Sequence, residues 1–164
     1  MTIRKVLKNE IDDIRKVYLR AQQYMKETGN PEQWQDKDLS RELLLSDIEK
    51  GNLYVIEDND DILGAFAFIP EADPTYNYID GSWLDELPYC AVHRVASSGK
   101  RGGIFKIIMD YAFTRTDCVK IDTHDDNLIM QHQLKKYGFT HCGTIYLSDG
   151  RPRLAYQLRK KIIK

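Results

Sequence analysis

Long apolar runs are missing from this 164-residue sequence, and neither charge is in excess. Because a membrane-spanning helix needs about 20 mostly apolar residues, we expect none here. The N-terminal residues also lack the apolar run of a signal peptide, so a cytoplasmic location is expected. The 24 basic and 25 acidic side chains nearly cancel. The sequence therefore does not predict the strongly basic surface of a general nucleic-acid-binding protein.

Cysteine and histidine are scarce as well, with three and four residues. Cys90, Cys118 and Cys142 are odd in number, widely spaced and set in apolar segments, which favours reduced thiols over a disulfide framework. The histidines and cysteines offer no compact ligand pair with the spacing of a zinc site. We therefore expect no bound metal.

Hydrophobic periodicity predicts both helices and strands along the chain. Asn9 is the expected N-cap of the first helix, which stops at the Gly-Asn-Pro sequence of residues 29–31. Residues 70–88 are expected to be irregular, and loops of this length are usually functional or mobile. The expected elements, in chain order, are strand 2–7, a helix after Asn9, helix 39–50, strands 52–57 and 62–69, strand 89–96, helix 103–115, strand 118–123, helix 127–137, and strands 139–147 and 153–158.

The order of these elements indicates the fold class. Strand, helix, strand and helix follow one another over residues 89–137, which implies a parallel strand pair, whereas hairpins near both ends imply antiparallel neighbours. We therefore expect residues 1–164 to form a single α/β (α+β) domain. Its sheet should be mixed and mostly antiparallel, with about seven strands and with helices on both faces.

The most informative segment is the polar, glycine-bearing turn between strand 89–96 and helix 103–115. Glycines allow backbone N–H groups to approach an anion, and the N-terminus of a helix adds a favourable dipole. Lys100 and Arg101 supply local positive charge in a nearly neutral chain. By itself, this pattern fits a phosphate site and an ordinary strand-to-helix turn equally well.

The same turn resembles motif A of the GNAT superfamily of acetyl-CoA-dependent N-acetyltransferases. That motif has arginine or glutamine, two residues, glycine, one residue, and then glycine or alanine. Lys100 stands in the arginine or glutamine place, Gly103 matches the glycine, and Phe105 replaces the last small residue. A second family pattern is matched by Asn127, which is followed after eleven residues by Gly138-Phe139. The order of elements agrees with the family over nearly the whole chain.

This resemblance implies a fold, a cosubstrate and a reaction. In the family, the fourth and fifth strands are parallel and splay apart to admit acetyl-CoA, and no metal takes part. The acetyl group then passes directly to a primary amine, here of a small molecule or a peptide, within a ternary complex. A catalytically weak acyl-CoA-binding or sensing module of the same fold is the alternative. The coenzyme contacts carried over from the family are Arg94, Val95, Lys100, Arg101, Gly102, Gly103, Ile104, Phe105 and Asn127.

The expected catalytic residues depart from the family at one position. The tyrosine that commonly protonates the leaving thiolate is replaced by Leu134. Tyr146 is a candidate substitute on the following strand. For the base, Tyr89 matches a position used by relatives, and His93 lies four residues further on the same strand face. A structural role for His93 is the alternative.

Residues 70–88 combine aromatic and acidic side chains that could attract and seat a cationic amine. Alternatively, the aromatic side chains cover the sheet and the acidic ones are simply solvated. The sequence leaves the oligomeric state open, a homodimer included. The expected substrate-binding residues are Trp34, Tyr76, Tyr78 and Trp83.

Overall fold

The computed structural model describes residues 1–160, which form two compact units. The first unit comprises Met1–Phe68 and Arg94–Phe105, and the second comprises Ile69–His93 and the chain from Lys106 onward. Strands β3 (Asp61–Ile69) and β5 (Cys90–Ser97) and helix α3 (Ile104–Ala112) each begin in one unit and end in the other. The single domain expected from the sequence stays a prediction.

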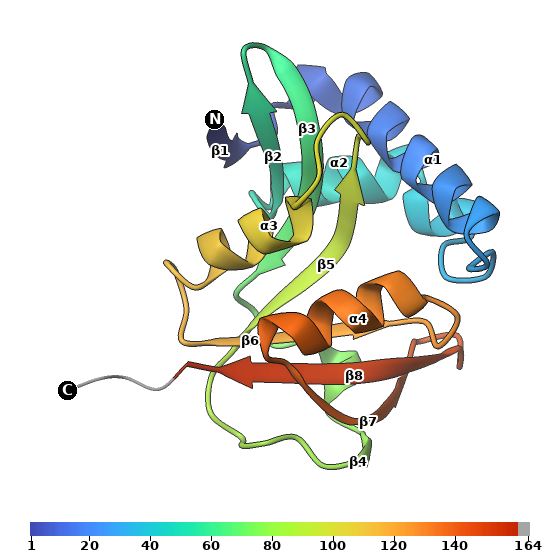
Figure 1. The fold of residues 1–164 in the computed structure, drawn as a ribbon, viewed down its shortest axis with the longest axis vertical. Coiled ribbons are helices and arrows are strands. Elements are labelled where there is room, and N and C mark those ends of the chain that lie inside the picture. Colours follow the sequence, from blue (N-terminus) through green and yellow to red (C-terminus); the bar gives the residue numbers. More distant parts are fainter. Residues whose placement is uncertain (161–164) are drawn as a thin grey trace. The chain divides into compact units, whose positions relative to one another are not determined.

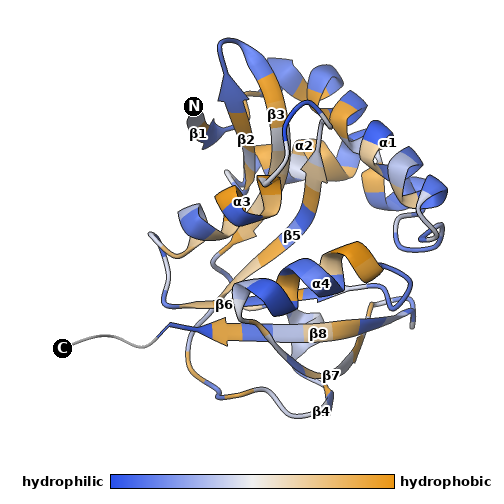
Figure 2. Cartoon of the chain, in the orientation of Figure 1, coloured by the Kyte–Doolittle hydropathy of each residue, from blue (hydrophilic) through white to orange (hydrophobic). Residues whose placement is uncertain are grey.

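The first unit is built on three antiparallel strands and two helices (Figure 1). β2 and β3 are mostly apolar, with the orange colour of Figure 2 giving way to blue at their acidic hairpin ends, and most of their residues are buried. The helices contact each other, and the second also contacts β2. These elements are β1 (Thr2–Lys5), α1 (Ile11–Glu27), α2 (Arg41–Glu49), β2 (Leu53–Asp58) and β3 (Asp61–Ile69).

The predicted Asn9 cap is wrong, because Asn9 lies inside a 3-10 turn formed by Lys8–Glu10. Glu10 occupies the N-cap position of α1 instead. Its carboxylate accepts hydrogen bonds from the backbone N–H of Leu7 and from the guanidinium of Arg4. Because these contacts hold Glu10 at the N-cap, the helix begins at Ile11, one residue later than a cap at Asn9 would place it.

The second unit contains three longer strands and a helix. β6 pairs with β8 over six residues, and β8 pairs in turn with β7, all antiparallel. The helix ends at Gly138, whose φ of +117° is the left-handed conformation expected of a glycine C-cap. These elements are β6 (Cys118–Thr123), α4 (Leu128–Tyr137), β7 (Thr140–Tyr146) and β8 (Pro152–Arg159).

The prediction that residues 70–88 are irregular needs correction. The segment contains a 3-10 turn, Pro74–Tyr76, and a two-residue strand, β4 (Asp80–Gly81), which pairs with β7. With β4 included, the sheet has eight strands among the described residues, close to the expected number of about seven. Glycine permits this pairing, because a Cβ atom on Gly81 would lie 2.3 Å from the carbonyl oxygen of Cys142. So short a strand has no hydrophobic period and was not visible in the sequence.

The strand order is β1-β2-β3-β5-β6-β8-β7-β4, and β5 and β6 are the parallel pair. The predicted mixed, mostly antiparallel sheet is thereby confirmed. The recorded parallel pairs are Cys90 with Val119 and Ala91 with Lys120. His93 and Asp122, two residues further along their strands, are therefore beyond the ladder. No helix within residues 1–160 combines the length and apolar character that crossing a membrane requires.

Candidate functional site

The predicted anion-binding turn joins β5 to α3 in the first unit. Gly99 and Gly103 have φ values of +80° and +76°, which glycine adopts without strain. The Ser97 hydroxyl accepts a hydrogen bond from the N–H of Gly99 and tightens the turn. Beyond the adjoining residues, no atom lies within 4 Å of where a Cβ on Gly102 or Gly103 would stand. The turn is thus open on the side that an anion would approach.

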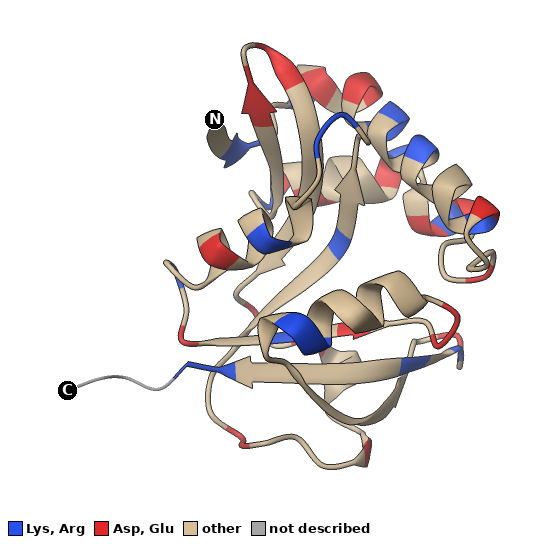
Figure 3. Cartoon of the chain, in the orientation of Figure 1, with Lys and Arg blue, Asp and Glu red and all other residues tan. Residues whose placement is uncertain are grey.

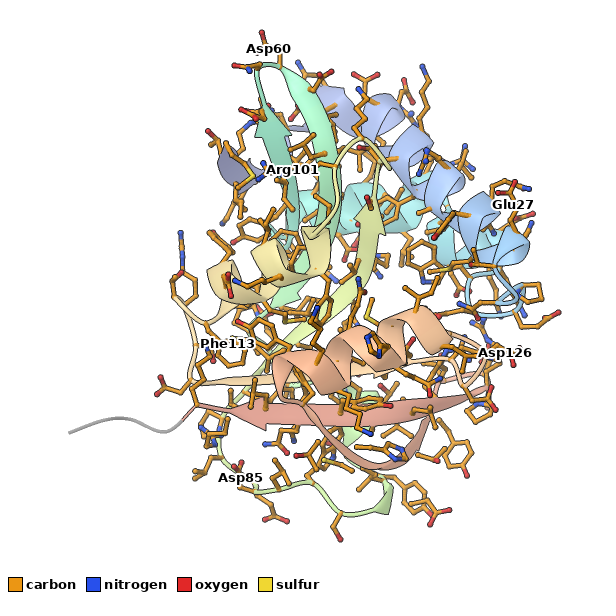
Figure 4. All side chains as sticks on the ribbon, viewed as in Figure 1. Glu27, Asp60, Asp85, Arg101, Phe113 and Asp126 are labelled. Carbon is orange, nitrogen blue, oxygen red and sulfur yellow. The ribbon has the colours of Figure 1, made fainter. Side chains whose placement is uncertain are left out.

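Three cationic side chains surround this turn. Arg101 lies on the segment between β5 and α3. Part of this segment is blue in Figure 3, and Arg101 is labelled in Figure 4. Lys100 forms a 3.0 Å ion pair with Asp61, and both side chains are more than half exposed. Such exposed pairs contribute about 0–1 kcal/mol, so an anion can readily replace this carboxylate. Arg20, from α1, was missed by the sequence analysis because it is distant in the chain; its guanidinium lies beside Gly99 and 3.5 Å from the Ser97 carbonyl oxygen.

A local cap in the second unit positions the acidic side chain of Asp73. Asp73 is the N-cap of the 3-10 turn, and its Oδ1 accepts hydrogen bonds from the N–H and hydroxyl of Thr75. Pro74 follows at the first turn position, where its missing N–H costs nothing. The backbone N–H of Asp73 donates to the Tyr89 hydroxyl at 2.8 Å. The sequence Asp-Pro-Thr therefore fixes a carboxylate next to β5.

His93 lies between two carboxylates. Its Nε2 is 2.9 Å from Oδ2 of Asp73, and its Nδ1 is 3.6 Å from Oδ2 of Asp122 on β6. Burial alone would raise the pKa of Asp73, but hydrogen bonds from His93 and Thr75 outweigh it and lower that pKa to about 2. Because the ionised carboxylate can only accept, Nε2 of His93 is inferred to carry the proton shared with Asp73. In the neutral imidazole, Nδ1 then holds the lone pair.

Tyr76 completes this arrangement. Its hydroxyl donates to Oδ2 of Asp122 at 2.7 Å, and its ring lies 5.9 Å from the ring of His93. The side chain is fully packed against Ala91 and Ile145, and this burial, followed by the adjacent Asp122 charge, raises the tyrosine pKa well above its usual value. Tyr76 therefore remains a hydrogen-bond donor. Its position agrees with the alternative that aromatic residues of this loop cover the sheet.

Lys120 is a buried lysine that the sequence analysis did not single out. It is only 4% exposed, and its ammonium lies 4.2 Å from the ring centre of Trp83 and 4.1 Å from that of Tyr89. Burial lowers the pKa of Lys120. The Trp83 indole N–H donates to the Tyr76 carbonyl oxygen. Trp83, which was predicted to seat a substrate amine, thus lies against a lysine of the chain itself, together with the predicted base Tyr89. The available signal was a lysine between the apolar residues Val119 and Ile121 of a strand.

The other predicted substrate and catalytic residues are dispersed. Trp34 is buried in the first unit against the ring of Tyr18. In the second unit, Tyr78 and Tyr146 are 67% and 41% exposed, with ring centres 6.3 Å apart. No contact links either of these two tyrosines to His93 among the described interactions. Leu134, in place of the family tyrosine, is fully buried and offers no proton.

The remaining coenzyme candidate, Asn127, is the N-cap of α4. Its side-chain oxygen accepts a hydrogen bond from the N–H of Met130 at 3.0 Å. A capping asparagine is explained by helix stability alone, at about 1 kcal/mol. A contact between Asn127 and the coenzyme therefore stays a prediction.

The three cysteines are free, as predicted, although only Cys118 is fully buried. One group of possible metal ligands occurs in the described part of the chain, at His124, Asp125 and Asp126. The Nδ1 of His124 accepts a hydrogen bond from the backbone N–H of Asp126, and both carboxylates are exposed. This loop geometry accounts for the grouping without an ion.

No known family model and no curated protein matches the sequence, but solved structures do. An acetyltransferase of the GNAT family from Streptococcus agalactiae is 30% identical, with a TM-score of 0.86, over 98% of this chain and 96% of that one. A putative acetyltransferase from Staphylococcus aureus is 23% identical, with a TM-score of 0.70 over 98% of this chain and 100% of its own.

A third structure shares the fold at lower identity. It is a putative acetyltransferase from Salmonella typhimurium, solved with its cofactor acetyl-CoA, with 16% identity and a TM-score of 0.63 over 100% of this chain and 96% of that one. The streptococcal relative has a higher sequence identity and a higher TM-score than this structure, and the match covers nearly the full length of both chains. On that similarity and the shared sheet topology, this chain belongs to the GNAT family of acetyltransferases.

Proposed function

We propose that the protein transfers the acetyl group of acetyl-CoA to a primary amine of a small molecule or peptide. The observation that carries this proposal, beyond family membership, is the placement of His93 between Asp73 and Asp122. A partly buried imidazole held by a carboxylate is the arrangement used to take a proton from a nucleophile. A cytoplasmic location is proposed with it.

The coenzyme fits the turn before α3. Backbone N–H groups from Arg101 to Phe105 would bind the pyrophosphate, with Lys100 and Arg20 nearby as counter-charges. Glycine at 102 and 103 leaves this side of the turn open, as an incoming diphosphate requires. Acetyl-CoA supplies an activated thioester, and the protein supplies position and proton transfer.

His93 acts on the acceptor. Its Nδ1 lone pair faces Asp122, so an ammonium group can donate one hydrogen bond to Nδ1 and another to the carboxylate. Proton transfer to Nδ1 releases the free amine, whose lone pair attacks the thioester carbonyl. The tetrahedral adduct then expels the CoA thiolate, which takes up the second proton that the nitrogen loses as the amide forms. Asp73 stabilises the imidazolium that forms.

The test is an amine screen that detects release of free thiol from acetyl-CoA. Wild-type protein should acetylate at least one amine class, and His93→Gln should lower kcat by about 10²- to 10⁴-fold, the range for lost general-base catalysis. His132→Gln, on the exposed surface of α4, is the control and should keep full activity.

Acetyl-CoA binding, measured in the same preparations, separates the two functional classes. Binding without thiol release from any amine would favour the sensing alternative, which the buried Leu134 supports because it removes the usual proton donor. Unchanged kcat in His93→Gln would reject the assigned base.

A further inference from the structure

One residue inside β5 has a backbone conformation that a strand does not normally allow. Arg94 has a φ of +50°, in the left-handed region. The other non-glycine residues with positive φ within residues 1–160 are Asn59 and Asp60, at the tip of the β2–β3 hairpin, where a tight turn requires it. Left-handed backbone costs an ordinary L-residue roughly 1–2 kcal/mol. Such a conformation persists only where surrounding contacts enforce it.

Both first-unit helices hold Arg94 in place. The hydroxyl of Tyr18, on α1, donates to the Arg94 carbonyl oxygen at 2.9 Å. The Arg94 guanidinium is paired with the Asp47 carboxylate on α2, and both side chains are largely buried. Tyr18 is fully buried, and its ring packs edge-on against that of Trp34 with the ring centres 5.7 Å apart, which restrains the position of its hydroxyl.

These contacts also fix the next amide. No peptide bond in the described chain is cis, and in a trans peptide the carbonyl oxygen and the following N–H point in opposite directions. The Arg94 carbonyl points at Tyr18, so the Val95 N–H points to the other side of the strand. If Arg94 relaxed to ordinary extended backbone, this peptide plane would rotate and the N–H would turn with it.

We propose that Tyr18 and Asp47 are positioning residues that aim the Val95 N–H at the thioester carbonyl oxygen of acetyl-CoA. This inference rests on the proposed function. A donor fixed before the reaction stabilises the negative charge that develops on this oxygen, and removal of one such donor typically costs about 10²- to 10³-fold in kcat. The strain at Arg94 is then compensated by the two side-chain contacts and serves to orient the donor.

The experiment requires no knowledge of the acceptor amine. Carbonyl-¹³C-labelled acetyl-CoA is bound to the protein, and isotope-edited infrared difference spectroscopy measures the stretching frequency of its thioester carbonyl. A hydrogen bond from Val95 lowers this frequency in the wild-type complex relative to free acetyl-CoA. In Tyr18→Phe the frequency should return toward the free value while the dissociation constant changes little.

Two further variants make the comparison specific. Tyr54→Phe removes another buried tyrosine hydroxyl, on β2, and should keep the wild-type frequency. Asp47→Asn removes the charge that holds the Arg94 side chain and should weaken the frequency shift in the same direction as Tyr18→Phe. Circular dichroism checks that each variant is folded. If Tyr18→Phe does not fold, Asp47→Asn alone serves as the test.

The outcomes separate this inference from the proposed function. A wild-type frequency equal to that of free acetyl-CoA, or a shift that persists in both Tyr18→Phe and Asp47→Asn, overturns the positioning role and leaves coenzyme binding intact. A wild-type protein that does not bind acetyl-CoA overturns the proposed function, and this inference with it.

Discussion

Asp73 links the local cap, the charge of the site and the stability of the protein. In the unfolded chain its carboxyl has an ordinary pKa near 3.8, whereas hydrogen bonds in the folded state lower it to about 2 despite burial. Between these values the unfolded state binds more protons, so the stabilisation is complete above about pH 4 and is lost as the pH falls through 2. A difference of this size corresponds to about 2 kcal/mol.

We therefore expect Asp73→Asn to lower the free energy of unfolding by about 2 kcal/mol at pH 6, and by progressively less as the pH falls below 4. Urea unfolding at several pH values measures this difference. Asp60→Asn, at the exposed tip of the β2–β3 hairpin, is the control and should show no such trend. A wild-type advantage that stayed constant down to pH 2 would mean that the Asp73 carboxylate is not specifically stabilised.

At the scale of elements, the turn before α3 and the turn between β7 and β8 offer a matched pair of glycines. Gly103 and Gly150 both have positive φ values, +76° and +91°, and a Cβ on either would meet nothing within 4 Å. Alanine at either position should therefore cost about 1 kcal/mol of stability through backbone strain alone. Only Gly103→Ala should also weaken acetyl-CoA binding, because only its methyl group occupies the proposed phosphate site.

Thermal unfolding and calorimetric titration of both variants measure these two effects separately. Equal affinity of Gly103→Ala and Gly150→Ala for acetyl-CoA would remove this turn from the coenzyme site. A loss of affinity in both would instead point to a general effect of destabilisation.

The elements also show what a single sequence can predict. The strand at 118–123 was predicted with the bounds observed, and the helix before Gly138 with its observed C-terminal end and a start one residue early, because the apolar period and the glycine stop signal act locally. β4 has only two residues and depends on its distant partner in β7, so no local pattern predicted it.

The residues of the candidate site also fall into two groups: those that the sequence alone indicates, and those whose roles depend on contacts with distant segments. His93 and the glycine turn were found from residue type and position along the chain. The roles of Asp73, Asp122 and Lys120 depend on contacts between segments 20 or more residues apart, which no periodicity reports. The left-handed backbone of Arg94 also had no signal, because it is imposed on an arginine by Tyr18 and Asp47 rather than chosen by a glycine.

For the whole molecule, the path of the chain through the two units predicts cooperative unfolding. The chain passes from one unit to the other three times, and these passages lie inside β3, β5 and α3. Neither unit can lose its structure without disrupting an element that continues into the other. We therefore expect a single calorimetric transition whose calorimetric and van't Hoff enthalpies agree, as for one domain.

Saturating acetyl-CoA should move this entire transition. At a ligand concentration of 100 times the dissociation constant, linkage adds about 2.7 kcal/mol, which raises the midpoint of a chain this long by roughly 5–10 °C. Acetyl-pantetheine, which lacks the diphosphate, is the comparison ligand and should give a much smaller shift if the turn before α3 supplies most of the affinity. Two separate transitions, of which acetyl-CoA moved only one, would show that the units unfold independently and would contradict the single-domain prediction.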